Sequence, residues 1–369
     1  MTAARALVVA LLGVVAAPAA PAAPALAQSP TLVQGIAASE YWNTGTTSNL
    51  LSRNNGRPAV AMQLDIWAAI EPVSAVVLHA LMSVDHESGT DTQIELEQYG
   101  LRYTKSRALV LDAGRILSPI GVFASRRFAD RNPLMMAPDA YPTQYPYGGQ
   151  ISGVVRWFDY RATVMSLPAV HEGYTPDPSH APRPALSVGV TPYVGVRLGM
   201  SYTRGPYLND TLSATQLSQR GWRSYEQQIA AADFAASVGY LELHSEAAWS
   251  SYEVPGQSEA VDGLAYYVEG KYTLHPRLFA AARMQRNDYP FIGWVNAPAG
   301  GFWVATKTDF HDEEFGIGVR LSARALLKAT YHQDIWQVTP QNSAFVGPGD
   351  RVFGVQLSYA FDAMEWLRR

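Results

Sequence analysis

Short segments of alternating polarity recur along this chain, and they constrain its fold more than any other feature. The segment at 351–361 is typical, with Phe353, Val355, Leu357, Tyr359 and Phe361 separated by glycine, glutamine, serine and alanine. Side chains of a β-strand point alternately to its two faces. The pattern therefore predicts a strand with one wholly apolar face, which ends in two aromatic residues, and one small polar face.

Comparable segments follow one another through the rest of the sequence. They lie at approximately 34–43, 59–69, 74–85, 93–104, 107–116, 151–159, 161–168, 185–191, 193–203, 224–235, 238–252, 261–273, 277–287, 311–321, 324–336 and 351–361. This is about sixteen strands, an even number, and each has roughly the ten residues that a tilted strand needs to cross a membrane.

The connectors between these segments alternate in length. The long ones cover 44–58, 86–92, 117–150, 169–184, 204–223, 253–260, 288–310 and 337–350. The short ones are expected at Glu71-Pro72, Lys105-Ser106, Asp159-Tyr160, Pro192-Tyr193, Ala236-Ser237, His275-Pro276 and Ser322-Ala323. Membrane barrels have tight turns at one end and longer loops at the other. The fold of a soluble sandwich or propeller does not require long and short connectors to alternate along the whole chain.

The N-terminus and the composition agree with passage through a membrane by strands. Residues 1–27 have one charge, Arg5, then an apolar run and the small-x-small pattern Ala25-Leu26-Ala27, which predicts a cleaved signal peptide. The formal charge of −4 argues against a nucleic-acid binder, and the chain has no cysteine. No later apolar run is long enough for a spanning helix. Only a closed barrel satisfies the backbone of strands in lipid.

With these features assembled, the chain resembles a Gram-negative outer-membrane porin of the 16-stranded type. The expected fold class is all-β, a transmembrane antiparallel up-and-down barrel over 28–361, followed by a C-terminal tail at 362–369. One segment sharpens the resemblance, Gly114-Arg115-Ile116-Leu117-Ser118-Pro119-Ile120-Gly121, which opens the longest connector. The resemblance implies that this connector, 117–150, folds into the barrel and constricts it.

Candidate site residues follow from the resemblance and from the alternation. The expected pore constriction contains Arg115, Arg126, Arg127, Asp130, Arg131 and Asp139. The expected lumen-lining residues are Arg197, Glu242, His244, Glu246, Lys271, Arg283, Arg320 and Lys328. Phe353, Tyr359 and Phe361 are the candidate assembly signal, although the chain continues beyond Phe361. Opposed charges in a wet pore bias ion passage, but the same residues also fit solvated or paired charges. No metal site, cofactor or catalytic motif is expected.

The expected function is passive diffusion of small hydrophilic solutes or ions across the outer membrane, with no enzymatic step. A substrate-selective, anion-leaning channel remains open, as do an outer-membrane enzyme or adhesin acting through external loops and a soluble exported β-protein. The expected surroundings are outer-membrane lipid and lipopolysaccharide, the outer-membrane assembly machinery and, by resemblance alone, two further copies in a homotrimer. No nucleic-acid partner is expected.

Overall fold

The computed structural model describes residues 31–44, 58–138, 145–166, 180–208, 220–295, 302–337 and 351–367. All of them belong to the unit Thr31–Arg369. The expected signal peptide, 1–27, lies outside the described residues. Among those described, no helix is long and apolar enough to cross a membrane.

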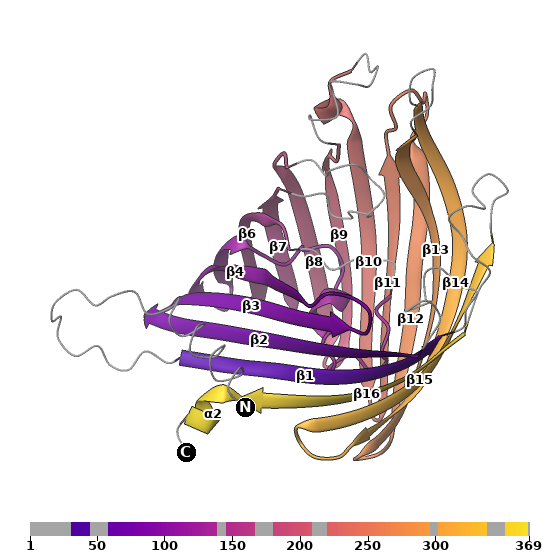
Figure 1. Ribbon diagram of the computed structural model, residues 1–369. Coiled ribbons are helices and arrows are strands. Elements are labelled where there is room, and N and C mark those ends of the chain that lie inside the picture. Colours follow the sequence, from indigo (N-terminus) through magenta and orange to yellow (C-terminus); the bar gives the residue numbers. More distant parts are fainter. Residues whose placement is uncertain are drawn as a thin grey trace. The chain divides into compact units, whose positions relative to one another are not determined.

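The described residues form sixteen strands, one for each segment that the alternation predicts (Figure 1). Their bounds are β1 Thr31–Thr44, β2 Ala59–Val73, β3 Val76–Glu87, β4 Gln93–Ser106, β5 Leu109–Arg115, β6 Tyr147–Val155, β7 Phe158–Met165, β8 Arg183–Tyr193, β9 Val196–Pro206, β10 Glu226–Val238, β11 Leu241–Tyr252, β12 Val261–His275, β13 Leu278–Val295, β14 Phe302–Arg320, β15 Ala325–Gln337 and β16 Arg351–Asp362. The 3₁₀ turns η2 (Phe123–Arg126) and η4 (Trp222–Ser224) and the short helix α2 (Ala363–Leu367) complete the described elements.

The strands form one closed barrel in chain order, and each pairs antiparallel with its two neighbours. β16 closes the barrel on β1 in continuous register, from Gln34 opposite Asp362 to Thr44 opposite Val352. Closure leaves no strand edge, so no row of backbone N–H and C=O groups is left in lipid without hydrogen-bond partners. The predicted fold class, an all-β up-and-down barrel of sixteen strands, is confirmed.

The two faces of the wall differ as the alternation predicts. In β9, Leu198, Met200 and Tyr202 are 48%, 66% and 43% exposed, whereas the alternating Ser201 and Thr203 are buried. Exposed large apolar side chains occur on most of the strands. Such an outer face is costly in water and suits lipid.

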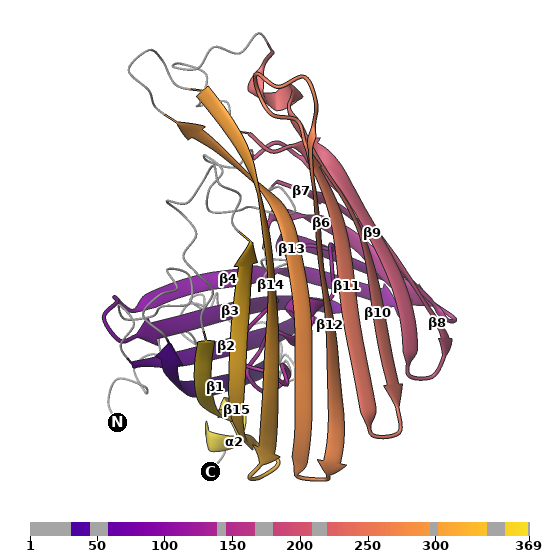
Figure 2. The ribbon, with the colours of Figure 1, turned by 90° about the vertical axis from the view of Figure 1, so that its right-hand side faces the viewer.

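The short turns lie at one end of the strands, and several of them can be followed in Figure 2. Several sit two or three residues from their predicted positions. The turn predicted at Pro192-Tyr193 is at Val194-Gly195, and the one predicted at Ala236-Ser237 is at Gly239-Tyr240. Both contain a glycine with positive φ, +86° and +61° respectively. Glycine adopts this conformation without steric cost, and this decides where the chain reverses.

Two other segments also differ from expectation. The connector predicted at 288–310 is mostly strand, because β13 and β14 pair as far as Val295 and Phe302. At the C-terminus, β16 includes Asp362, whose Oδ1 accepts hydrogen bonds from the backbone N–H groups of Met364 and Glu365 at 2.9 and 3.3 Å. Asp362 thus caps α2, as aspartate commonly does at a helix start.

Candidate functional site

The connector after β5, called here the inner loop and described at 116–138 and 145–146, begins at an arginine clamp. Arg115 donates to the backbone oxygens of Leu96 and Tyr145 at 2.7 and 3.1 Å, and to Glu95 Oε1 at 2.6 Å. Just before it, Gly114 has φ +137°, and a Cβ there would lie 2.3 Å from the Tyr99 oxygen. Arg115 therefore ties the first and last described parts of the inner loop to the wall.

Apolar side chains of the inner loop are buried against widely separated parts of the inner wall. Ile120 packs with Met165 and Ile229, on β7 and β10. Phe128 and Ala129 pack with residues of β1 and β3, Leu134 with residues of β13 and β15, and the two methionines after it with residues of β1, β2 and β16. Each buried side chain of this size contributes about 1.5–3 kcal/mol. The inner loop therefore lies inside the barrel and contacts the wall on several sides.

Buried hydrogen bonds and ion pairs join the inner loop to β11–β14. Glu246 Oε2 accepts a hydrogen bond from the Val122 backbone N–H at 2.9 Å, and Arg126 Nη1 donates to Glu269 Oε1 at 2.8 Å. Arg283 lies between Glu269 and Glu314, at 3.1 and 2.6 Å, with all three side chains 1% exposed. A buried charge is tolerated when it is paired and hydrogen-bonded. These charges thus hold one another and the inner loop in place.

The loop's backbone is held in the same way on β14 and β15. Glu314 Oε1 accepts from the backbone N–H groups of Met135 and Met136 at 3.0 and 3.1 Å. Lys328 Nζ donates to the backbone oxygens of Asn132 and Leu134, both at 2.9 Å, and Lys328 is 1% exposed. A buried carboxylate and a buried ammonium therefore satisfy backbone groups that the irregular loop leaves unpaired.

The arginines of the inner loop differ in how open they are. Arg127 pairs with Glu97, and its side chain is 16% exposed. Arg131 is 56% exposed, and its Nε is 3.9 Å from Asp130 Oδ1. Burial raises the pKa of the Asp130 carboxyl above its ordinary value, and Arg131 opposes this shift. Burial likewise raises the pKa of the Tyr145 phenol, which accepts from Arg127 Nε at 3.3 Å.

Comparison with solved structures places this arrangement among known barrels. The anion-selective porin of Comamonas acidovorans is 9% identical, with a TM-score of 0.60 over 90% of this chain and 100% of that one. OmpF of Salmonella typhi, solved with daunomycin, is 11% identical, with a TM-score of 0.57 over 90% and 98%. The trimer form of OmpT, an outer membrane protein of Vibrio cholerae, is 11% identical, with 0.58 over 90% and 99%.

The chain has the fold of the 16-stranded outer-membrane porins. No family model and no curated protein sequence matches the chain. The likeness is therefore one of fold, at identities of 9–11%.

Within this porin fold, the residues expected to line the lumen all occupy inward positions of their strands, but in different surroundings. Glu246, Arg283 and Lys328 are buried at the contacts with the inner loop. Arg197 binds both oxygens of Asp159 at 2.8 and 3.0 Å and also pairs with Asp233. The others are more open: Glu242 and Lys271 pair at 2.6 Å, His244 is half-buried and Arg320 is exposed.

The positions of the expected constriction residues and of the candidate assembly signal can also be compared with the structure. Arg115, Arg126, Arg127, Asp130 and Arg131 lie at the base of the inner loop or within it, and Asp139 lies outside the described residues. Phe353 and Tyr359 face outward at 47% and 40% exposure. Phe361 lies over Gly35, where a Cβ would be 2.3 Å from its ring. The described residues include no group of three or more His, Asp or Glu that could hold a metal ion.

The last strand's polar face differs from expectation. An open lumen would leave the small polar face of β16 in water, but Gln356 and Ser358 on that face are 2% and 1% exposed. Ser358 Oγ lies 3.5 Å from the Ala129 oxygen of the inner loop. The loop covers this part of the wall, and alternation alone cannot show which inward positions a loop will cover.

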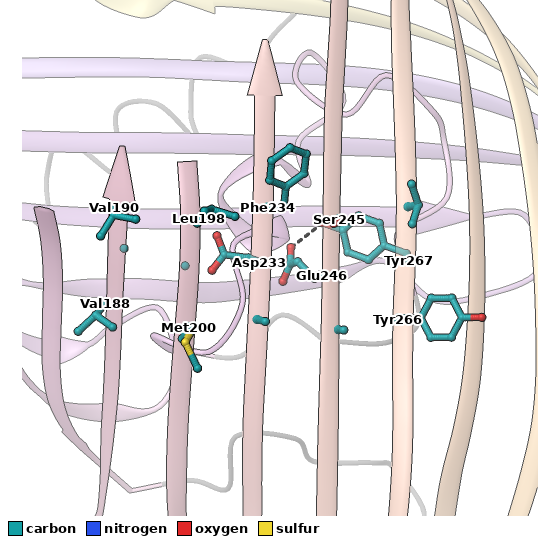
Figure 3. A pocket seen from close by; sticks show the side chains of 15 residues that line it. Val188, Val190, Leu198, Met200, Asp233, Phe234, Ser245, Glu246, Tyr266 and Tyr267 are labelled. Carbon is teal, nitrogen blue, oxygen red and sulfur yellow. Dashed lines mark hydrogen bonds between the residues drawn. The ribbon is translucent and has the colours of Figure 1, made fainter. Parts of the chain in front are cut away.

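The wall carboxylates Glu269 and Glu314 were not among the sequence candidates for the site. Their alternation places them inward, yet their loop partners are 143 and 178–179 positions away in the chain. Figure 3 shows inward and outward side chains of one part of the wall in a single view. There Glu246 accepts a hydrogen bond from Tyr267 at 2.5 Å, beside the apolar groove that Val188, Met200 and Tyr266 help to line.

Proposed function

We propose that the chain is an outer-membrane channel for passive diffusion of small hydrophilic solutes and ions. The observation that carries this proposal is the inner loop, fixed to several sides of the inner wall of a closed barrel. A ring of sixteen strands is too wide for side chains alone to fill, so its polar interior holds water. The inner loop then narrows the path, and no chemical step is required.

The rest of the molecule supports the same environment. The apolar outer face suits lipid and lipopolysaccharide, and residues 1–27 would direct export. The end with the short turns would face the periplasm, with Phe353, Tyr359 and Phe361 available to the assembly machinery. A homotrimer is supported by the trimer form of the similar Vibrio cholerae protein.

Conductance of the purified protein in planar bilayers tests the channel directly. Discrete current steps in potassium chloride are expected. Protein that inserts without conductance steps contradicts the proposal and leaves a role for the external loops, as in an outer-membrane enzyme or adhesin.

An anion-leaning channel is the second candidate, and Arg131 is the observation that favours it. Arg126 and Arg127 are paired with wall glutamates, whereas the Arg131 side chain is 56% exposed. The similar Comamonas acidovorans protein is an anion-selective porin. Exposed charge near a narrow wet path acts on ions within the screening length, about 8 Å at physiological salt.

Arg131→Gln should therefore shift the reversal potential in a salt gradient toward cation selectivity. Arg126→Gln combined with Arg127→Gln should shift it further in the same direction, because two positive charges are removed, Glu97 loses its partner and, among the described residues, Glu269 keeps only Arg283. The matched control is Arg204→Gln, since Arg204 pairs with Glu226 on the outer face. If neither loop change moves the reversal potential, the inner loop is not the constriction.

A further inference from the structure

A row of inward side chains crosses five adjacent strands on the short-turn side of the inner loop. In register, Asp362 of β16 faces Gln34 of β1, and Gln34 faces Trp67 of β2. The row continues through Leu81 of β3 to Gln98 of β4. The Trp67 indole thus has the Gln34 amide on one neighbouring strand, and on the other side Leu81 separates it from the Gln98 amide; Trp67 and Gln98 are half-buried, and Gln34 is exposed.

The inner loop covers this row and leaves a cavity of about 510 Å³, which also includes Asp130, Arg131 and Arg324 in its lining. The Phe128 ring meets Trp67 edge to face, with centroids 4.5 Å apart. Arg131 Cζ lies 6.0 Å from the Trp67 ring centroid. The loop thus fixes the indole from one side, while the indole remains part of the cavity lining.

The charges around the cavity are balanced. Asp130 and Arg131 are adjacent on the loop side, and Arg324 and Asp362 are on the turn side. Asp130 Oδ1 is buried and accepts no hydrogen bond from the described residues. The lining itself has two acids and two bases, and Arg324 is also paired with Glu365 outside the lining, so no excess positive charge marks the cavity as an anion site. These acids and bases do supply donors and acceptors beside an apolar ring face, together with the amides, which are both donor and acceptor.

From this geometry we propose that the cavity is a binding subsite for a neutral, hydroxyl-rich solute of monosaccharide size. Such a solute has C–H groups that pack on an indole face and hydroxyl groups that both donate and accept. Trp67 receives the ring, and Gln34, Gln98, Asp130 and Arg131 bind the hydroxyl groups. This inference rests on the proposed channel function, because it places the subsite on the solute's path.

The test is single-channel current in planar bilayers with D-glucose added on the short-turn side. In the unmodified protein, glucose is expected to reduce the current in a saturable way, beyond the change in solution conductivity. Trp67→Ala should raise the glucose concentration for half-maximal reduction about tenfold, the size expected for a lost aromatic contact with its buried area. Gln34→Ala should raise it severalfold and does not disturb the contact with Phe128.

Trp157→Ala is the matched control, because Trp157 is 59% exposed in the turn between β6 and β7. It should leave the glucose effect unchanged. If the protein gives conductance steps but glucose has no saturable effect on them, the subsite proposal is contradicted and the channel proposal is not. A glucose effect that Trp67→Ala and Gln34→Ala leave unchanged would overturn the subsite proposal too. Absence of any conductance would instead overturn the channel proposal itself.

Discussion

At the scale of single residues, inward charges of the barrel have two different roles. Arg283 and Lys328 are buried and hold the inner loop, whereas Arg131 is open. The period-two alternation predicts which wall side chains point inward, but it does not predict which of them the inner loop will cover. The difference arises because the loop returns to the wall at points far away in the sequence.

Arg283→Gln provides the sharpest test of the loop attachment. It removes the cation between Glu269 and Glu314, both of them buried, and leaves Glu269 with Arg126 and, among the described residues, Glu314 with its backbone hydrogen bonds alone. The free energy of unfolding should fall by about 3–5 kcal/mol, as when one partner of a buried pair is removed. Unfolding in urea from detergent or lipid measures this, and noisier single-channel current is expected as the loop loosens.

Arg204→Gln is the control, because its pair with Glu226 lies on the outer face with side chains 51% and 30% exposed. Its effect should be below about 1 kcal/mol. Equal losses in the two variants would show that the buried network does not hold the inner loop.

At the scale of elements, the period-two pattern was sufficient to find every strand, but the turns required glycine geometry. The turn before β9 lies two residues beyond its predicted position, because the chain reverses at Gly195, which has positive φ, and not at Pro192. The hairpin of β13 and β14 is longer than the sequence predicts, because its distal part lacks clear alternation. Its pairing continues regardless, since each strand there satisfies the other's backbone.

Gly195→Ala should destabilise the barrel, because Gly195 has φ +86° and a new Cβ would lie 2.5 Å from the Ser237 oxygen. A loss of about 1–2 kcal/mol or more is expected from the left-handed conformation. Gly221→Ala is the control, since a Cβ there meets nothing within 4 Å. Urea unfolding of the two variants compares them, and similar stabilities would contradict the assigned turn.

At the scale of the whole molecule, closure of β16 on β1 is the decisive contact. It joins residues more than 300 positions apart and leaves no strand edge. The tail is tied to the barrel on the other side of β16, because Arg324 in the turn before β15 donates to Glu365 of α2 at 2.5 Å. The pairing of β16 with β1 is thus complete even though α2 follows the strand.

An engineered disulfide tests the closure, and the absence of native cysteine makes the result clear. Ser39 and Leu357 face each other in register on the outer face. Ser39→Cys with Leu357→Cys should crosslink within one chain, because directly paired Cα atoms are about 4.5–5.5 Å apart. Electrophoretic mobility with and without reductant detects the bond.

Ser39→Cys with Phe353→Cys is the control, since Phe353 pairs four residues away, opposite Asn43. This pair should stay largely reduced under the same oxidation. If both pairs crosslink equally, or neither does, the register of the seam is not the one described.

The sequence by itself indicated about sixteen strands, their two faces and the alternation of short and long connectors, and the resemblance that these features carry implied the up-and-down order. These features are local, because side-chain direction and turn chemistry depend on neighbours in the chain. Only the tertiary structure decided that Glu269 and Glu314 hold the inner loop, that Gln356 and Ser358 are buried, and that Trp67 lines a cavity beneath Arg131. Those contacts join distant segments, and they form only once the barrel closes around the loop.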